Sequence, residues 1–104
     1  MNQEENFVRN ASRNNLLFFT EHAHDKMRKL KLDVSTVINC IETGMLVEQQ
    51  HGYEGEDPRM VFYNGHDSCL NVVVAVTSTN CLTITVYEVD FDKWEKIGES
   101  IKRK

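Results

Sequence analysis

The chain has no long apolar run, no CxxC pair and no basic segment followed by an apolar one at its start. A membrane-spanning helix needs about 20 predominantly apolar residues, so none is expected. The start, MNQEENF, does not resemble a secretory signal, and a cytoplasmic location is the expectation. The three cysteines, Cys40, Cys69 and Cys81, are an odd number, which indicates reduced thiols rather than a disulfide framework.

Signatures of several common active sites are also missing. The sequence contains no HExxH motif, no paired-cysteine ligand set and no Gly-rich phosphate loop. His22 and His24 are two residues apart, which on a helix would turn them about 160° from each other. His66, which follows the turn signal Asn64-Gly65, is interpreted as a loop histidine. The sequence therefore predicts neither a metal site nor a cofactor.

Size and charge set the remaining bounds. A chain of 104 residues forms one domain with a modest core. The net charge of −4 argues against unaided binding to nucleic acid, but the charges are unevenly distributed. Basic residues gather beside His22 and His24 and again at the chain end: Lys26, Arg28, Lys29, Lys31, Lys102, Arg103 and Lys104. The first group is either a solvated helix face or a surface for an anion.

The stretch LNVVVAVTSTNCLTITVY, from Leu70 to Tyr87, predicts a central antiparallel hairpin. Its β-branched runs favour strands, and the short polar break at residues 78–80 turns the chain back. The second strand alternates. Leu82, Ile84 and Val86 are expected to face the helices, and the side chains expected on the opposite, more polar face are Thr83, Thr85 and Tyr87.

The other elements follow from caps and periodicity. Residues 1–15 are expected to be flexible, and Leu16–Phe19 is either an edge strand or a lead-in to a helix. Helices are predicted from Thr20 to Lys31 and from Asp33, as N-cap, to Gly44. Strands follow at 45–50 and 59–63, with a surface loop at 51–57 between them. A short helix is predicted over 91–101, with Phe91, Trp94 and Ile97 on the face that packs on the core. This predicts an α+β fold of two helices on a four-stranded, mainly antiparallel sheet. The domain is expected to span residues 16–98, and a basic tail follows at 99–104.

Three motifs in this order carry a family resemblance: T-x-HA-x-x-K-M at Thr20–Met27, V-x-x-x-I-E-x-G at 37–44, and ITVYE-x-D-x-x-x-W at Ile84–Trp94. Together, over residues 18–95, they resemble an uncharacterised bacterial and archaeal domain family, a domain of unknown function. That family is similar in strand pattern to the RelE, MqsR and BrnT toxins of type II toxin–antitoxin systems. Relatives carry Arg-Gly where this chain has Lys29-Leu30, so the turn into the second helix is expected to differ.

The resemblance implies a metal-independent endoribonuclease that cleaves mRNA by attack of the 2′-hydroxyl. It also implies RNA and a cognate antitoxin as partners, with a YgiT-type zinc-finger protein as one candidate. Such chemistry needs a base, an acid and a cation near the phosphate. The candidates divide into catalytic residues, which are His22, Lys26, Arg59 and Tyr87, and substrate-binding residues, which are Lys29, Tyr63 and Thr85.

Each of these candidates also has a structural interpretation. His22, Lys26 and Lys29 share one helix face, which presents them to a phosphate or merely to solvent. Arg59, Tyr63, Thr85 and Tyr87 line one sheet face, or else the arginine pairs with an acid and the tyrosines are half-buried. The acidic balance and the lack of an obvious acid–base pair favour a second hypothesis, a non-catalytic protein-binding module of the same fold. Both hypotheses stay open at the level of the sequence.

Overall fold

The fold is that of a computed structural model, which describes residues 3–50, 57–65, 69–77 and 80–104. In chain order the elements are α1 (Gln3–Arg13), β1 (Leu17–Phe19), α2 (Glu21–Leu30), α3 (Val34–Thr43), β2 (Met45–Gln50), β3 (Arg59–Asn64), β4 (Leu70–Val76), β5 (Cys81–Glu88), β6 (Trp94–Ile97) and β7 (Ser100–Arg103). The α+β class is therefore confirmed. Most of the loop expected at 51–57, the turn residues Ser78 and Thr79, and His66 lie outside the described residues.

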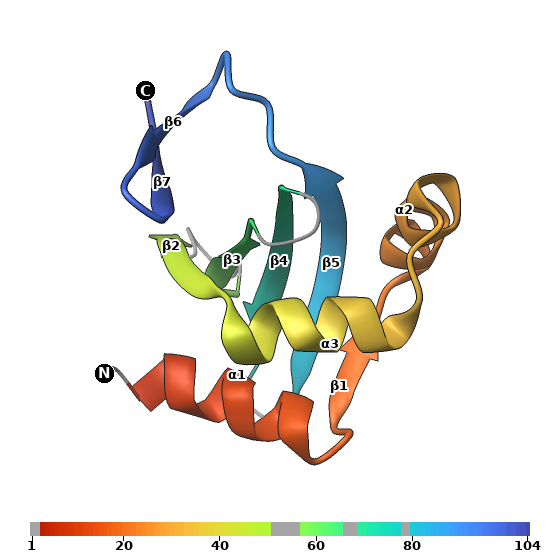
Figure 1. The fold of residues 1–104 in the computed structure, drawn as a ribbon. Coiled ribbons are helices and arrows are strands. Elements are labelled where there is room, and N and C mark those ends of the chain that lie inside the picture. The colour runs from red at the N-terminus through yellow and green to blue at the C-terminus, as the bar shows by residue number, and fades with distance from the viewer. Residues whose placement is uncertain (1–2, 51–56, 66–68, 78–79) are drawn as a thin grey trace.

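A five-stranded sheet in the order β1-β5-β4-β3-β2 forms the centre of the molecule, and β6 and β7 form a separate two-stranded sheet (Figure 1). All neighbours in the large sheet are antiparallel except β1, which runs parallel to β5. The expected hairpin is its middle, and β1 confirms the edge strand that was one of two readings of Leu16–Phe19. The expected four strands become five because β1 joins through a parallel pairing.

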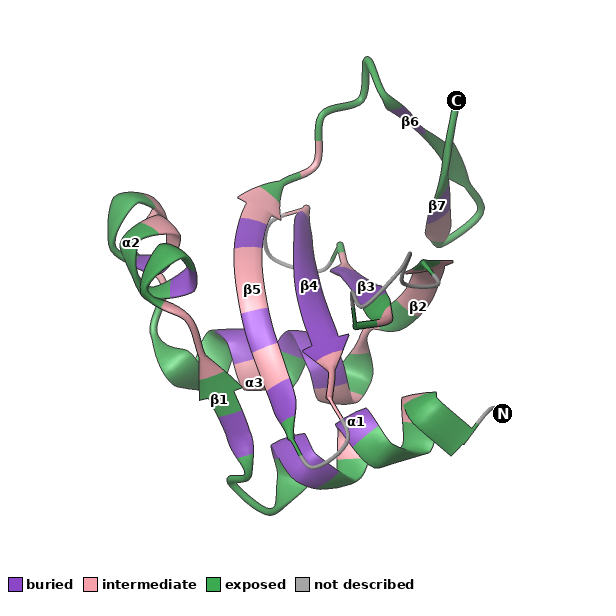
Figure 2. Ribbon diagram, turned by 180° about the vertical axis from the view of Figure 1, so that it is seen from behind, coloured by how far each residue is buried: buried purple, intermediate pink, exposed green. Residues whose placement is uncertain are grey.

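Helices α1 and α3 cover one face of the sheet, which we call the helix face (Figure 1). Its core contains Met60, Phe62, Val72, Val74 and Val86. Strand β4 is buried almost throughout, as Figure 2 shows. Side chains on both faces of β4 are therefore covered, as is typical of a central strand.

The N-terminal segment differs from the prediction of a flexible tail. Residues 3–13 form α1, which packs against α3 and buries Val8 completely. Glu4 and Glu5 lie in its first turn and Arg13 in its last, so the charges suit the helix dipole. The prediction failed because the segment is polar on average. Its narrow apolar stripe stabilises a helix only when it packs against α3.

The helix expected over 91–101 is absent, and a β-hairpin stands in its place, so that prediction was wrong. Trp94 and Ile101 are buried at 2% and 3% exposure, whereas Phe91 and Ile97, expected on the same helix face, are exposed. Gly98 has φ +60° and begins a two-residue turn, the geometry that joins tightly paired strands. The basic tail at 99–104 therefore belongs to the fold, because β7 runs through it.

Both central helices begin at the predicted caps. Thr20 Oγ1 accepts the Ala23 N–H, and Asp33 accepts the N–H and the hydroxyl of Thr36. Lys31 ends α2 at φ +57°, and this left-handed residue makes the turn toward α3 without a glycine. Gly44 follows α3 as expected, but in extended backbone. It must be glycine for space, since an added Cβ would lie 2.3 Å from the Cys40 carbonyl oxygen.

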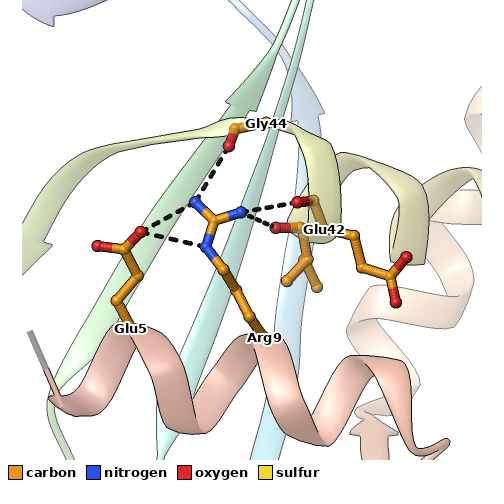
Figure 3. A network of polar contacts seen from close by, with 5 residues as sticks. Glu5, Arg9, Glu42 and Gly44 are labelled. Atoms are coloured by element: carbon orange, nitrogen blue, oxygen red, sulfur yellow. Dashed lines mark hydrogen bonds and ion pairs between the residues drawn. The ribbon is translucent and has the colours of Figure 1, made fainter. Parts of the chain in front are cut away.

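Arg9 of α1 ties the end of α3 to the sheet, as Figure 3 shows. Its guanidinium donates to the carbonyl oxygens of Ile41, Glu42 and Gly44 at 2.8, 2.9 and 3.1 Å, and to the Glu5 carboxylate at 3.1 Å. It also lies 5.3 Å from the centre of the Phe62 ring. One side chain thus satisfies the carbonyls that every helix leaves open at its C-terminus.

Replacing Arg9 with methionine keeps the apolar stem and removes these bonds, which leaves part-buried carbonyls unsatisfied. We expect the free energy of unfolding, measured by urea denaturation, to fall by about 2–3 kcal/mol. Arg13→Met on the exposed side of α1 is the control and should change it by less than about 0.5 kcal/mol. Equal losses in the two variants would contradict the role of Arg9.

Candidate active site

The face opposite α1 and α3 carries the most concentrated polar chemistry in the described chain. We call it the hairpin face, because β6 and β7 pack on it through Trp94 and Ile101 against Val61 and Val73. Two β-bulges decide which side chains it receives. Val47 is the extra residue in β2 and Ile84 the extra residue in β5, since the registers jump there.

The bulge at Val47 turns Glu48 onto the hairpin face, opposite Val61. Strict alternation would have placed Glu48 with Leu46 in the helix-face core. The bulge at Ile84 has a similar effect on β5: Thr83 pairs with Val74 on the helix face, while Thr85 and Tyr87 stay on the hairpin face. The expected grouping of Thr83 with Thr85 and Tyr87 was therefore wrong, as was that of Leu82 with Val86, because Leu82 pairs with Ala75.

Glu48 and Arg103 form a two-point ion pair on this face. Arg103 Nε donates to Glu48 Oε1 at 2.8 Å, and Nη2 donates to Oε2 at 3.1 Å. The guanidinium carbon lies 4.6 Å from the centre of the Trp94 ring, so the indole stabilises the cation through a cation–π contact. The Glu48 side chain is 23% exposed and that of Arg103 47% exposed, which leaves the pair open to a solute.

Tyr87 completes the group. Its hydroxyl accepts a hydrogen bond from Asn71 Nδ2 at 3.3 Å, and Asn71 is fully buried. Within the described residues Asn71 Oδ1 has no hydrogen-bond partner, which is unusual for a buried amide. Glu48, Arg103, Tyr87 and Asn71 thus come from four strands, and we call them the Glu–Arg–Tyr site.

The site is electrostatically coupled. The hydrogen bonds from Arg103, then a hydrogen bond from Gln50 and the charge of Arg103, hold the pKa of Glu48 below its ordinary value of 4.5, against the opposing effect of burial. Glu48 in turn raises the pKa of Arg103, and Tyr87 adds to that shift from close by. At neutral pH the site therefore presents a carboxylate, a guanidinium and a phenol to the same space.

Comparison with known protein families gives one match. The model of the family described as Domain of unknown function (DUF4258) matches residues 19–88, which is more than half of the chain. The chain belongs to this family. Among curated proteins and solved structures the comparisons found no match.

The DUF4258 match contains Glu48, Asn71 and Tyr87 but ends before Arg103. Its start coincides with the Thr20–Met27 motif, whose structural meaning is now visible. Thr20 Oγ1 donates to the carbonyl oxygen of the bulged Ile84 at 2.9 Å, and Ala23 and Met27 are buried. The motif docks α2 beside β5, beyond the end of β1 (Figure 1).

Helix α2 carries three of the predicted site residues. His22 and Lys29 are exposed and Lys26 is half-buried. In the described part of the chain no hydrogen bond or ion pair joins any of them to Tyr87 or Arg59. His24, which the prediction set aside, packs its ring 5.6 Å from that of Phe19. The helix therefore offers a basic outer surface, not a formed acid–base pair.

The predicted residues on the sheet are only partly brought together. Arg59 is exposed and shares the hairpin face with Tyr63, but four residues separate them, which is about 13 Å along a strand. Tyr63 pairs with Asn71, and Asn71 with Tyr87, so these three form one row across the sheet. Arg59 thus lies at the far end of β3 from the row of Tyr63, Asn71 and Tyr87, but it is a diagonal neighbour of Glu48, which pairs with Val61.

Tyr63 does not offer an open ring for a base. It is 3% exposed and lies beside Trp94 in the hairpin-face core. Burial, and then the hydrogen bond to the Cys69 sulfur at 3.9 Å, raise the pKa of its phenol. Its edge lines a cavity of about 260 Å³, bounded also by Thr43, Asn64, Lys96 and Glu99. Thr85, half-buried, lies one row from Tyr87 on the same face.

The buried cysteines have no nucleophilic character. Burial raises the pKa of Cys40 to about 12 and that of Cys81 to about 11, so both are thiols at neutral pH. In the described ranges no three His, Cys, Asp or Glu side chains gather as metal ligands. Nor does any described helix have the length and apolar character to cross a membrane.

Proposed function

We propose that this DUF4258 protein is a toxin-like component of a type II toxin–antitoxin system, of the RelE, MqsR and BrnT kind. Its activity is metal-independent endonucleolytic cleavage of mRNA. The Glu–Arg–Tyr site carries the proposal, because it joins a carboxylate, a guanidinium and a phenol on one exposed sheet face. These are the base, the cation and the proton donor that attack by a 2′-hydroxyl requires.

The roles follow from charge. Glu48 removes the proton from the 2′-hydroxyl, whose oxygen then attacks the adjacent phosphorus. Arg103 holds the phosphate oxygens as negative charge builds on them, and a planar guanidinium can contact two of them at once. Tyr87 gives its proton to the departing 5′-oxygen. The products are a 2′,3′-cyclic phosphate and a 5′-hydroxyl.

Phosphate binding also changes the base. In the free protein Arg103 directs two of its five N–H donors to Glu48 and depresses the pKa of that carboxylate. When the phosphate takes part of the guanidinium, Glu48 loses hydrogen bonds and its pKa rises toward that of an ordinary glutamate. The carboxylate becomes a stronger base when the substrate is in place.

The α2 surface provides a place for the RNA backbone. His22, Lys26 and Lys29 supply donors for phosphates on the strand entering the site, and the lysines add the positive charge that a protein of net charge −4 otherwise lacks. A cognate antitoxin, for which a YgiT-type zinc-finger protein is a candidate, would cover this surface and the sheet face.

A closed Glu48–Arg103 pair also suits a second function. The two side chains satisfy each other, and a pair of this kind can simply hold β7 on β2. In that case the chain is a non-catalytic protein-binding module, an accessory or degenerate toxin fold.

The deciding experiment incubates the purified protein with a defined mRNA in EDTA, with and without ribosomes, and analyses the product ends. We expect new 2′,3′-cyclic phosphate and 5′-hydroxyl ends, and growth arrest on expression of the gene. His22→Ala, checked for folding, should cleave within about tenfold of the native rate because His22 lies outside the Glu–Arg–Tyr site. No cleavage and no growth arrest would support the protein-binding module instead.

A further inference from the structure

The sheet has an edge that is both open and apolar. Strand β1 has β5 on one side and no strand on the other. Residues 16–19 read Leu-Leu-Phe-Phe, without charge or proline, and Leu16 and Phe18 are 58% and 51% exposed. Proteins usually protect such edges with a charge, a proline or a bulge, or by keeping the strand very short. Strand β1 is short, with three residues, but its exposed apolar side chains indicate that something covers it.

The backbone of β1 indicates which kind of element could cover this edge. The Thr20 N–H donates to the Thr83 carbonyl at 3.0 Å, so Thr20 and, by alternation, Phe18 direct their backbone groups toward β5. Leu17 and Phe19 therefore direct theirs toward the open edge. Two N–H and two C=O groups spaced two residues apart form the hydrogen-bonding unit of an antiparallel strand.

The groove beside this edge indicates the charge of the segment that would bind there. It has a volume of about 250 Å³ and is lined by the apolar side chains of Phe7, Ala11, Leu16 and Phe18, together with Asn10, Asn14 and Asn80. None of its lining residues is charged, so a charged peptide would find no counter-ion there. A neutral apolar strand is the complementary occupant, and β1 itself is such a strand.

We propose that two copies of this chain associate through antiparallel pairing of their β1 strands about a two-fold axis at Phe18. Leu17 of each copy then exchanges hydrogen bonds with Phe19 of the other, which satisfies all four outward groups. The two Phe18 residues form a non-hydrogen-bonded pair, in which side chains lie closest. Their rings pack together on the hairpin face, and the surface is self-complementary, as a two-fold interface requires.

The dimer does not depend on the proposed function. Strand β1 pairs with residues 81–83 of β5, at the opposite end of that strand from Tyr87. Changes at Phe18 therefore leave the Glu–Arg–Tyr site alone, and the oligomeric state is measured without RNA.

The test uses the full chain in two forms. Phe18→Cys places one thiol against its symmetry mate at about 4.5 Å between Cα atoms, within the range of a disulfide. On mild oxidation we expect a covalent dimer on a non-reducing gel. Phe91→Cys, at a residue 42% exposed on a loop away from the edge, is the control and should give no covalent dimer on this gel, as should the native chain.

Sedimentation equilibrium of the native chain over a concentration series should give twice 12.1 kDa at high concentration. Phe18→Lys brings two ammoniums together and should raise the dissociation constant more than about tenfold, with unchanged circular dichroism. A native chain that is monomeric throughout, or a dimer indifferent to Phe18→Lys, overturns the proposal. Cross-linking of Phe91→Cys as fast as Phe18→Cys does so too, since it would mean random collision.

Discussion

Glu48→Gln should lower the rate of mRNA cleavage by about 10²–10⁴-fold, the usual contribution of a positioned general base. The amide has almost the shape of the carboxylate but cannot accept the proton of the 2′-hydroxyl. Arg103 would still find one oxygen to donate to, so binding of the RNA should change much less than the rate. The measurement is single-turnover cleavage of a defined mRNA at saturating protein, with circular dichroism to confirm folding.

A variant of Arg103 tests the same site through the pH dependence of RNA cleavage. Because Arg103 depresses the pKa of Glu48, the free protein keeps its base ionised well into the acid range. The acid limb of the second-order rate constant should lie below pH 4.5, the ordinary value for a glutamate. Arg103→Met removes the cause of the depression, so we expect the limb to move upward as the rate falls by about 10²–10³-fold.

The matched control is Glu95→Gln. Glu95 lies on the neighbouring strand β6 and meets only Lys102, at 3.9 Å, so the same change of charge occurs outside the Glu–Arg–Tyr site. It should cleave at the native rate. If Glu48→Gln cleaved as fast as Glu95→Gln, or if the acid limb stayed in place without Arg103, Glu48 would not be the base.

Local rules predicted the central parts of the fold because those parts obey them. The caps at Thr20 and Asp33, helix α3 and the hairpin of β4 and β5 follow from side chains that act within one turn or one strand. Helix α1 was missed because its burial of Val8 depends on α3, which lies far along the chain. The C-terminal hairpin was missed because a period of three, from Phe91 to Trp94 to Ile97, outweighed the turn signal at Gly98.

The site was harder to predict than the fold for a related reason. Tyr87 and Thr85 could be placed on one face by alternation, which survives at that end of β5. Glu48 could not, because the bulge at Val47 reverses the alternation just before it, and no local signal marks a bulge. Arg103 lay in a segment that looked like a solvated tail. Only the pairing of β6 with β7 and the docking of Trp94 bring it to Glu48.

Trp94→Ala should reduce the free energy of unfolding by about 3–5 kcal/mol, the cost of truncating a buried aromatic residue. Trp94 is 2% exposed and packs with Val61, Val73 and Ile101 between the hairpin and the large sheet. Its loss opens a cavity there and removes the ring beneath Arg103. Unfolding in urea, followed by circular dichroism because this is the one tryptophan of the chain, measures the change.

A second variant separates the packing of Trp94 from its contact with the guanidinium of Arg103. Trp94→Phe keeps an aromatic ring under the guanidinium and part of the packing, so it should recover more than half of the lost stability. Phe91→Ala, at the 42% exposed residue of the preceding loop, should cost less than about 1 kcal/mol. The hairpin holds Arg103 against Glu48, so RNA cleavage should fall with Trp94→Ala even at temperatures where the variant is folded. A loss of stability no larger than that of Phe91→Ala would mean that the hairpin does not pack on the sheet, and the Glu–Arg–Tyr site would then lack its cation.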